Sequence, residues 1–151
     1  MRIAFYKGPG RLFDKAIRLW TAGQYSHCEL ELKPSLWYSA DAWYNRVRIK
    51  FMVLSAENWD FIDLPLTQKQ CDDIYYNVLD KLGAKYDWLG IIFSQLVPIH
   101  LQSKSRWFCS ETVVDDLHHI GLLSEYACGD INPNRLYTLL EGLRKDIGVN
   151  G

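Results

Sequence analysis

A single cysteine stands at the start of a helix-like segment in the second half of the chain. Cys109 lies in "SRWFCSETVVDDL", where a short apolar run is followed by residues with helical spacing. A thiol becomes a strong nucleophile only when it ionises, and the unpaired N–H groups and dipole at a helix N-terminus stabilise the thiolate. Cys109 is therefore a candidate nucleophile for acyl transfer, although cysteine also commonly fills space in a core.

A candidate base for that thiol lies much earlier, in "GQYSHCELEL". If this segment is a strand, alternate residues share a face, so His27 lies on the side of Glu29 and Glu31. Cys28 then lies on the opposite, core-facing side and is a weaker nucleophile candidate than Cys109. The alternative interpretation of His27 is an exposed residue on a polar strand face.

The elements that must position these residues fall into two groups along the chain. Strands are predicted at 2–5, 26–32, 36–40, 45–51 and 58–64, and helices at 11–22, 68–82, 88–97, 109–120 and from 133 onward. Thr67 and Gln70 form a capping box, and Asn132 followed by Pro133 is typical of a helix start. Because strands dominate the first half and helices the second, we expect an α+β fold with a mainly antiparallel sheet packed against helices.

Length and charge restrict the class of protein. The 151 residues form one expected domain, 1–151, which is long enough to bury a core without a metal or disulfide. The net charge of -1 offers no basic field for a nucleic acid. In "NRVRIK" the basic residues Arg46, Arg48 and Lys50 alternate with apolar ones, which is typical of a half-buried strand with a solvated face. No nucleic-acid partner is expected.

Membrane and export signals are also weak. The longest apolar stretch, 88–101, is too short to span a bilayer and is interrupted by polar residues and a proline. The N-terminus has no apolar region followed by a small-residue cleavage site. We therefore expect no transmembrane segment and a cytoplasmic location.

In the first expected helix, 11–22, the apolar side chains of Leu12, Phe13, Ile17 and Trp20 fall on a single stripe.

The chain has four cysteines and no C-x-x-C pair: Cys28, Cys71, Cys109 and Cys128. Free thiols are expected where no export signal is seen. Cys71 falls on the apolar stripe of its helix and is expected in the core. A zinc site could be written from Cys109, His118, His119 and Cys128, but its spacing matches no usual structural zinc pattern. His118 and His119 are instead interpreted as surface or capping residues, and no metal or organic cofactor is predicted.

Together, "YSHCELEL" and the later "FCSETV" resemble the circularly permuted branch of the NlpC-type papain-like cysteine hydrolases, in which the His strand precedes the Cys helix. "FDKAIRLWT", "KYDWLGI" and "INPNRLYTLL" extend the similarity over nearly the whole chain. The resemblance implies a permuted papain-like fold, with Cys109 as nucleophile and His27 as general base and later acid. It also implies hydrolysis of peptide or cell-wall-peptide amides through a thioester, by a bacterial or bacteriophage-encoded protein of the host cytoplasm.

The resemblance further implies a third, polar residue that orients the imidazole, and it places that residue at Ser39. Serine departs from the usual His, Asn or Glu, so Glu29 and Asp41 are possible substitutes. For the developing oxyanion the backbone N–H of Cys109 is the natural first donor, and the hydroxyl of Tyr25 is a candidate second donor. A tyrosine at that place is otherwise a packing residue.

Two other functions stay open. The permuted branch includes lecithin-retinol-acyltransferase-like enzymes, so an acyltransferase or thioesterase acting on lipid-like esters is one alternative. An exposed apolar surface at 88–101 would favour it. The other is a noncatalytic binding module that keeps the fold, which a His27 side chain turned away from Cys109 would favour. The sequence predicts no oligomeric state.

Overall fold

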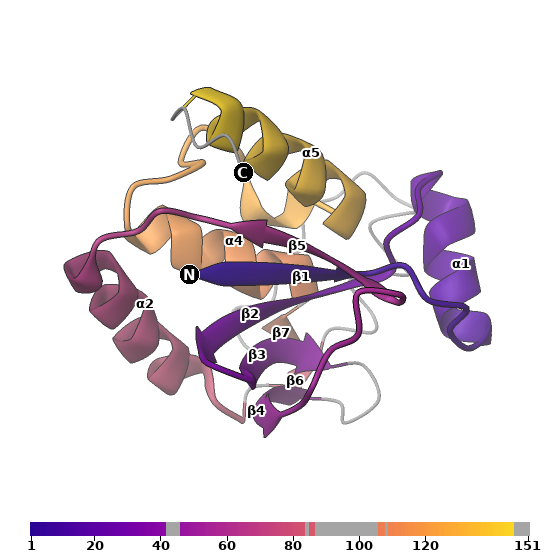
Figure 1. The fold of residues 1–151 in the computed structure, drawn as a ribbon, viewed down its shortest axis with the longest axis horizontal. Coiled ribbons are helices and arrows are strands. Elements are labelled where there is room, and N and C mark those ends of the chain that lie inside the picture. Colours follow the sequence, from indigo (N-terminus) through magenta and orange to yellow (C-terminus); the bar gives the residue numbers. More distant parts are fainter. Residues whose placement is uncertain (42–45, 84, 87–105, 108, 147–151) are drawn as a thin grey trace.

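The computed structural model describes residues 1–41, 46–83, 85–86, 106–107 and 109–146 (Figure 1). Its strands are β1 (Arg2–Tyr6), β2 (His27–Lys33), β3 (Leu36–Asp41), β4 (Arg46–Phe51), β5 (Trp59–Asp63), β6 (Lys85–Tyr86) and β7 (Arg106–Trp107). Its helices are α1 (Leu12–Thr21), α2 (Gln68–Lys81), α4 (Cys109–His119), the short 3₁₀ helix η1 (Cys128–Asp130) and α5 (Pro133–Asp146). The helix expected at 88–97 lies outside the described residues.

The strands form one sheet in the order β5-β1-β2-β3-β4-β6-β7. Neighbouring strands pair antiparallel throughout, except for the short parallel pair β6 and β7. The predicted α+β class with a mainly antiparallel sheet is confirmed, and the five longer strands lie within one or two residues of their predicted positions.

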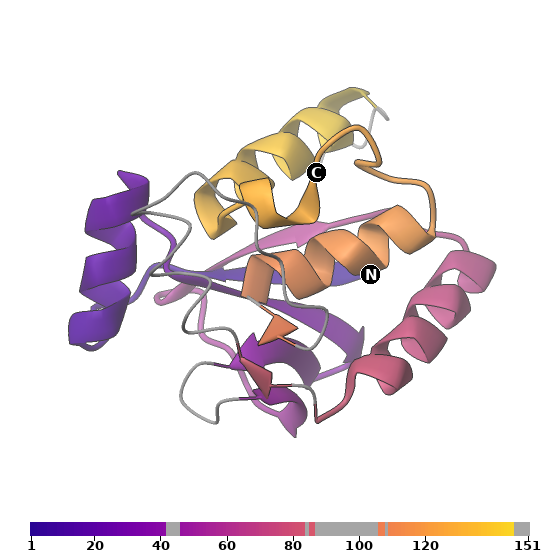
Figure 2. The same cartoon turned by 180° about the vertical axis from the view of Figure 1, so that it is seen from behind.

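One layer of helices covers the central strands. Figure 2 shows α4 lying across the sheet, with α2 and α5 on either side of it. Helix α4 packs against β2 and β3 and also contacts α2 and α5. The core between helix and sheet includes Leu30 of β2, Tyr38 of β3, and Val113 and Leu117 of α4. This packing fixes the N-terminus of α4 relative to β2.

Two helix starts follow from local hydrogen bonds. The Thr67 hydroxyl accepts the N–H of Gln70 at 3.3 Å, and the Gln70 side chain accepts the N–H of Thr67 at 3.0 Å, which begins α2. At the start of α5 the Asn132 side-chain oxygen accepts the N–H groups of residues 134 and 135, each at 3.0 Å. Both predicted helix starts are confirmed.

Helix α1 lies at the ends of the strands, apart from the helix layer (Figures 1 and 2). Of its apolar stripe only Ile17 is buried, whereas Leu12 is 85% and Trp20 is 45% exposed. Polar contacts also hold this helix, because the Arg18 guanidinium donates to the carbonyl groups of residues 7, 8 and 9. Helical spacing therefore identified the helix, but its apolar stripe is only partly buried.

Candidate active site

Cys109 is the first residue of α4, which begins just after the edge strand β7. Because α4 packs on β2, Cys109 lies against His27 and Cys28 at the start of that strand. Cys109 is 4% exposed, and its carbonyl accepts the hydroxyl of Thr112 at 2.9 Å in the first turn. The structure thus brings together the two residues predicted to form one site; their chemical roles stay predictions.

The surroundings of Cys109 favour its thiolate. A hydrogen bond from the Cys28 thiol holds the pKa of Cys109 well below its usual value, and the charge and hydrogen bond of the His27 imidazolium outweigh the opposing effect of burial. A backbone hydrogen bond from Cys28 lowers this pKa further. The N-terminus of α4 adds unpaired N–H groups and the positive end of a helix dipole. The arrangement favours a thiolate–imidazolium pair.

His27 begins β2, opposite Tyr6 of β1. Burial opposes a charged imidazole, but the Cys109 thiolate and then the Glu29 carboxylate raise the pKa of His27 to about 10. His27 Nε2 lies 3.0 Å from Glu29 Oε1. Since Nε2 is engaged by Glu29, Nδ1 is the ring nitrogen left to exchange a proton with Cys109. Trp59 meets the imidazole edge-on, with ring centroids 6.3 Å apart, so the ring is held on several sides.

The carboxylate of Glu29 is buried, with 1% exposed, and burying its charge without partners would cost free energy of folding. Arg48 supplies them: its Nη1 donates to Glu29 Oε2 at 2.9 Å and its Nη2 to Oε1 at 2.6 Å. Burial opposes ionisation, but His27 and then Arg48 lower the pKa of Glu29. An ionised Glu29 thus accepts the Nε2–H of His27 and orients the ring.

Arg48 is a part of the site that the sequence analysis missed. Its Nε and Nη2 also donate to Asp41 Oδ2, at 3.0 and 2.7 Å, so it bridges two carboxylates. The interpretation of Arg48 as a solvated strand residue is wrong, because its side chain is only 12% exposed. The sequence did contain a signal for this contact. Glu29 and Asp41 place two carboxylates on the two strands that precede the strand that carries the basic Arg48. Asp41, a candidate orienter, instead accepts hydrogen bonds from Arg48.

Ser39 does not make the contact expected of it. Its hydroxyl donates to the Cys28 carbonyl at 2.7 Å and lies 3.3 Å from the Ala40 carbonyl. In β3 it stands opposite Arg48 and is fully buried. The structure therefore gives the contact with the imidazole of His27 to Glu29, and Ser39 instead supports the backbone of β2 next to the histidine.

We expect Ser39→Ala to lower the free energy of unfolding by about 1 kcal/mol, because one buried hydrogen bond to a carbonyl is lost. The rate of Cys109 alkylation should be unchanged, because the thiolate, His27 and Glu29 keep their contacts. Urea unfolding and iodoacetamide kinetics measure the two effects. A large fall in the alkylation rate, with little change in stability, would return Ser39 to the role of orienter.

Tyr25 is engaged elsewhere. Its hydroxyl donates to Asp60 Oδ2 at 2.7 Å, and its ring packs against Phe5 and Tyr137, with centroids 5.4 and 4.6 Å away. Burial, and then the hydrogen bond to Asp60, raise the pKa of Tyr25. Because its one O–H is used by Asp60, Tyr25 is not placed as an oxyanion donor, and the alternative interpretation as a packing residue agrees with the structure.

A second Cys–His contact lies at the other end of α4. Cys128 Sγ is 3.3 Å from His118 Nδ1, and His118 Nε2 donates to the Leu123 carbonyl at 2.8 Å. Burial, together with nearby carboxylates, raises the pKa of Cys128 to about 11, so this thiol is a hydrogen-bond donor. Across the described ranges no group of three or more His, Cys, Asp or Glu side chains could hold a metal ion.

All four cysteines are free thiols. Cys28 and Cys109 are buried, whereas Cys71, which was expected in the core, is only half-buried on α2. The periodicity put Cys71 on the buried stripe, but Cys71 lies near the N-terminal end of α2, about one turn before Ile74, the first buried residue of the helix.

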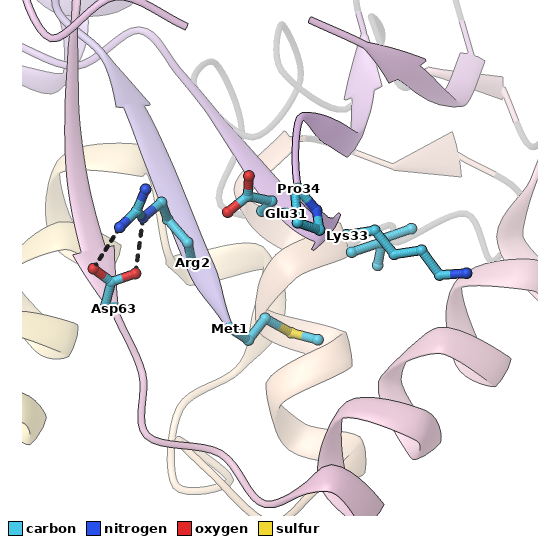
Figure 3. A pocket seen from close by; sticks show the side chains of 7 residues that line it. Met1, Arg2, Glu31, Lys33, Pro34 and Asp63 are labelled. Atoms are coloured by element: carbon cyan, nitrogen blue, oxygen red, sulfur yellow. Dashed lines mark hydrogen bonds and ion pairs between the residues drawn. The ribbon is translucent and has the colours of Figure 1, made fainter. Parts of the chain in front are cut away.

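A pocket of about 400 Å³ lies at the opposite end of β2 from His27 (Figure 3). Of its charged groups, Arg2 donates to both oxygens of Asp63 at 2.8 and 2.9 Å, and Glu31 accepts the N–H of Ser35 at 2.9 Å. The ammonium of Lys33 lies 5.9 Å from the centroid of the Tyr75 ring. The pocket contains no nucleophile and is separate from Cys109, so we do not assign it to the site.

A scan of the chain against protein-family models finds no match, and no curated protein matches it. Among the helices that the structure describes, none has the length and apolar character needed to cross a membrane. The functional argument therefore depends on the arrangement of Cys109, His27, Glu29 and Arg48.

Proposed function

We propose that this protein is a cysteine hydrolase of the permuted papain-like type, which transfers an acyl group through a thioester on Cys109. The observation that carries the proposal is that Cys109, at the start of α4, lies beside the imidazole of His27, whose Nε2 is 3.0 Å from Glu29 Oε1. A nucleophile, a base and an orienter in one chain of contacts are the parts that covalent acyl transfer requires. The order of His strand before Cys helix supports the permuted fold.

In the first half of the reaction, Cys109 Sγ attacks the carbonyl carbon of an amide, and the carbonyl oxygen becomes an oxyanion. The backbone N–H of Cys109, at the N-terminus of α4, is the first donor to that oxygen. His27 then gives its proton to the leaving nitrogen, the C–N bond breaks, and the acyl group remains on sulfur as a thioester.

In the second half, the neutral His27 takes a proton from water while the water oxygen attacks the thioester carbonyl. The C–S bond breaks, the acid is released, and Cys109 returns as a thiolate beside a protonated His27. Throughout the cycle Glu29 accepts the Nε2–H and stabilises the charged ring.

We assign the activity to amides of peptides or cell-wall peptides, within the cytoplasm of a bacterium or of a bacteriophage host. The support is the resemblance of the His-strand and Cys-helix motifs to enzymes that act on such bonds.

The proposal is tested by trapping the thioester. The protein is incubated with peptide p-nitroanilides and with cell-wall peptide fragments, quenched in acid and analysed by intact mass and peptide mapping. An acyl adduct on Cys109 that hydroxylamine removes is expected, and Cys109→Ala should show none. Cys71→Ser is the matched control and should still form it. Release of product by Cys109→Ala at the wild-type rate would contradict the proposal.

Alkylation should select Cys109 among the four thiols. At pH 5.5 iodoacetamide is expected to modify Cys109 faster than Cys28 or Cys128, because the pKa of Cys109 is lowered whereas burial raises the pKa values of the other two. A Cys71→Ser background removes the half-buried thiol from the comparison. Peptide mapping after timed quenching gives each rate, and equal rates at the three remaining cysteines would count against an activated thiolate.

A further inference from the structure

The first turn of α5 holds the segment that leads into β2. The side-chain oxygen of Asn134 accepts the N–H of Tyr25 at 2.8 Å, and its amide nitrogen donates to the Tyr25 carbonyl at 2.9 Å. The same nitrogen donates to the hydroxyl of Thr21, the last residue of α1, at 2.9 Å. One side chain thus satisfies both backbone polar groups of Tyr25 and joins α5 to the end of α1 and to the approach to β2.

Gly23 lies against this side-chain amide. A Cβ at residue 23 would overlap the amide group of Asn134. The φ of Gly23 lies outside the left-handed region, so the glycine is needed for the close approach and not for its backbone conformation. The amide of Asn134 is therefore packed tightly against the segment that it binds.

The chain is held again at the next residue, just before the histidine. The N–H of Ser26 donates to the Tyr6 carbonyl at 3.1 Å, and its hydroxyl donates to Asp14 Oδ1 at 2.9 Å. His27 then begins β2, opposite Tyr6 of β1. Contacts from α5, β1 and α1 thus fix the two residues that precede His27, and the contacts to the backbone of Tyr25 both come from Asn134.

We propose that Asn134 is a positioning residue of the candidate active site, which holds the backbone at Tyr25 so that His27 Nε2 stays within hydrogen-bond distance of Glu29 Oε1. That distance is 3.0 Å. Asn134 acts through the backbone of residues 25–27, so loss of its amide lets the start of β2 shift and moves the imidazole with it. The effect on turnover rests on the proposed function, whereas the effect on the contact between His27 and Glu29 does not.

The experiment follows the titration of His27 by NMR in full-length protein with isotope-labelled histidine, and the His27→Ala spectrum identifies its signals. Burial lowers the pKa of His27, but Cys109 and then Glu29 raise it to about 10 in the intact site. In Asn134→Ala we expect this pKa to fall, because the contact with the Glu29 carboxylate is loosened. With a substrate from the thioester trapping, kcat should fall roughly 10-fold and KM should stay unchanged.

Asn77→Ala is the matched control, because it also removes an asparagine amide that joins two elements. Asn77 Nδ2, on α2, donates to Asp116 Oδ1 at 2.9 Å and to Asp115 Oδ2 at 3.2 Å, both on α4. The midpoint of urea unfolding should fall in both asparagine variants, whereas the titration of His27 should move only in Asn134→Ala. An equal shift of the His27 titration in the two variants would overturn the inference, because it would reflect a general loss of stability.

Gly23→Ala tests the same contact without removing a hydrogen-bonding group. Its methyl group should displace the Asn134 amide and shift the His27 titration in the same direction, and this variant gives the answer even if Asn134→Ala does not fold. In Gly23→Ala/Asn134→Ala the methyl group has room, so the double variant should be no worse than Asn134→Ala alone. Full addition of the two effects would contradict the inference.

An unchanged His27 titration in folded Asn134→Ala and in Gly23→Ala would also overturn the inference, whatever the activity of the protein. A shifted titration in a protein that forms no thioester would support the positioning role and contradict the proposed function. The two proposals can therefore fail separately.

Discussion

Replacing His27 with alanine is expected to slow turnover by roughly 10³- to 10⁴-fold, because one side chain supplies both the charge that stabilises the thiolate and the proton for the leaving group. The protein should stay folded, since His27 is only partly buried and lies at the beginning of its strand. Steady-state kinetics on the substrate identified by thioester trapping measures the loss, and urea unfolding measures the stability.

His118→Ala is the matched control for this change. It also removes an imidazole that contacts a cysteine, but at the far end of α4 and beside Cys128. Turnover and Cys109 alkylation should both be unchanged in this variant. Equal losses in the two variants would show that the effect is a general one on α4, and would remove His27 from the proposed mechanism.

The pH dependence of Cys109 alkylation isolates the electrostatic effect of His27 on the thiol from its role in proton transfer. The positive imidazolium lowers the pKa of Cys109, so its removal must raise that pKa. In His27→Ala the rate of iodoacetamide modification should therefore fall at pH 5.5 and recover toward the wild-type value at pH 9. A profile that does not move toward alkaline pH would mean that His27 has no influence on the thiolate.

The class of fold was predictable because its signals are local. The capping box at Thr67 and the Asn132–Pro133 pair specify helix starts through contacts between residues three or fewer positions apart. Alternation of apolar residues located the five longer strands in the same way. Helix α1 shows the limit of local signals, because spacing identified its stripe but could not tell that Leu12 stays exposed.

The site was predictable only in part, for a reason that lies in the sheet. Cys109 and His27 carry their own signals, a helix start and a strand start. The choice among Ser39, Glu29 and Asp41 as orienter instead depends on how β2, β3 and β4 lie beside one another. Arg48 decides it, because this buried cation holds Glu29 ionised next to the imidazole. The contact reaches from β4 to β2 across β3, so neither segment alone can locate it.

Glu29→Gln is expected to separate orientation from the other parts of the site. The amide keeps the size of the carboxylate but loses its charge, so it no longer stabilises the imidazolium or fixes the Nε2–H with the same strength. We expect turnover to fall by roughly 10²-fold or more, while Cys109 can still be alkylated. The matched control is Glu31→Gln, on the same strand face, whose carboxylate contacts the Ser35 N–H instead of the histidine.

The same change should lower the free energy of unfolding by about 3 kcal/mol at pH 7, because removing one partner of a buried ion pair leaves the other uncompensated. This value is at the low end of the usual range because Arg48 keeps Asp41 as a second partner. In the double variant Glu29→Gln/Arg48→Met the buried cation is gone, so we expect stability to recover in part. Turnover should not recover, since the imidazole still lacks its carboxylate.

Acid titration gives an independent check on Glu29. The pKa of this carboxyl is lowered in the folded protein from its ordinary value of 4.5, so its stabilising effect is present above that value and is lost as the pH falls through the lowered pKa. Glu29→Gln has no such titration. The gap in unfolding free energy between wild type and Glu29→Gln should therefore be widest at neutral pH and shrink below about pH 4.5. A gap that does not depend on pH would show that the carboxylate contributes by its shape and not by its charge, and would remove its ionisation from the proposed role in orienting His27.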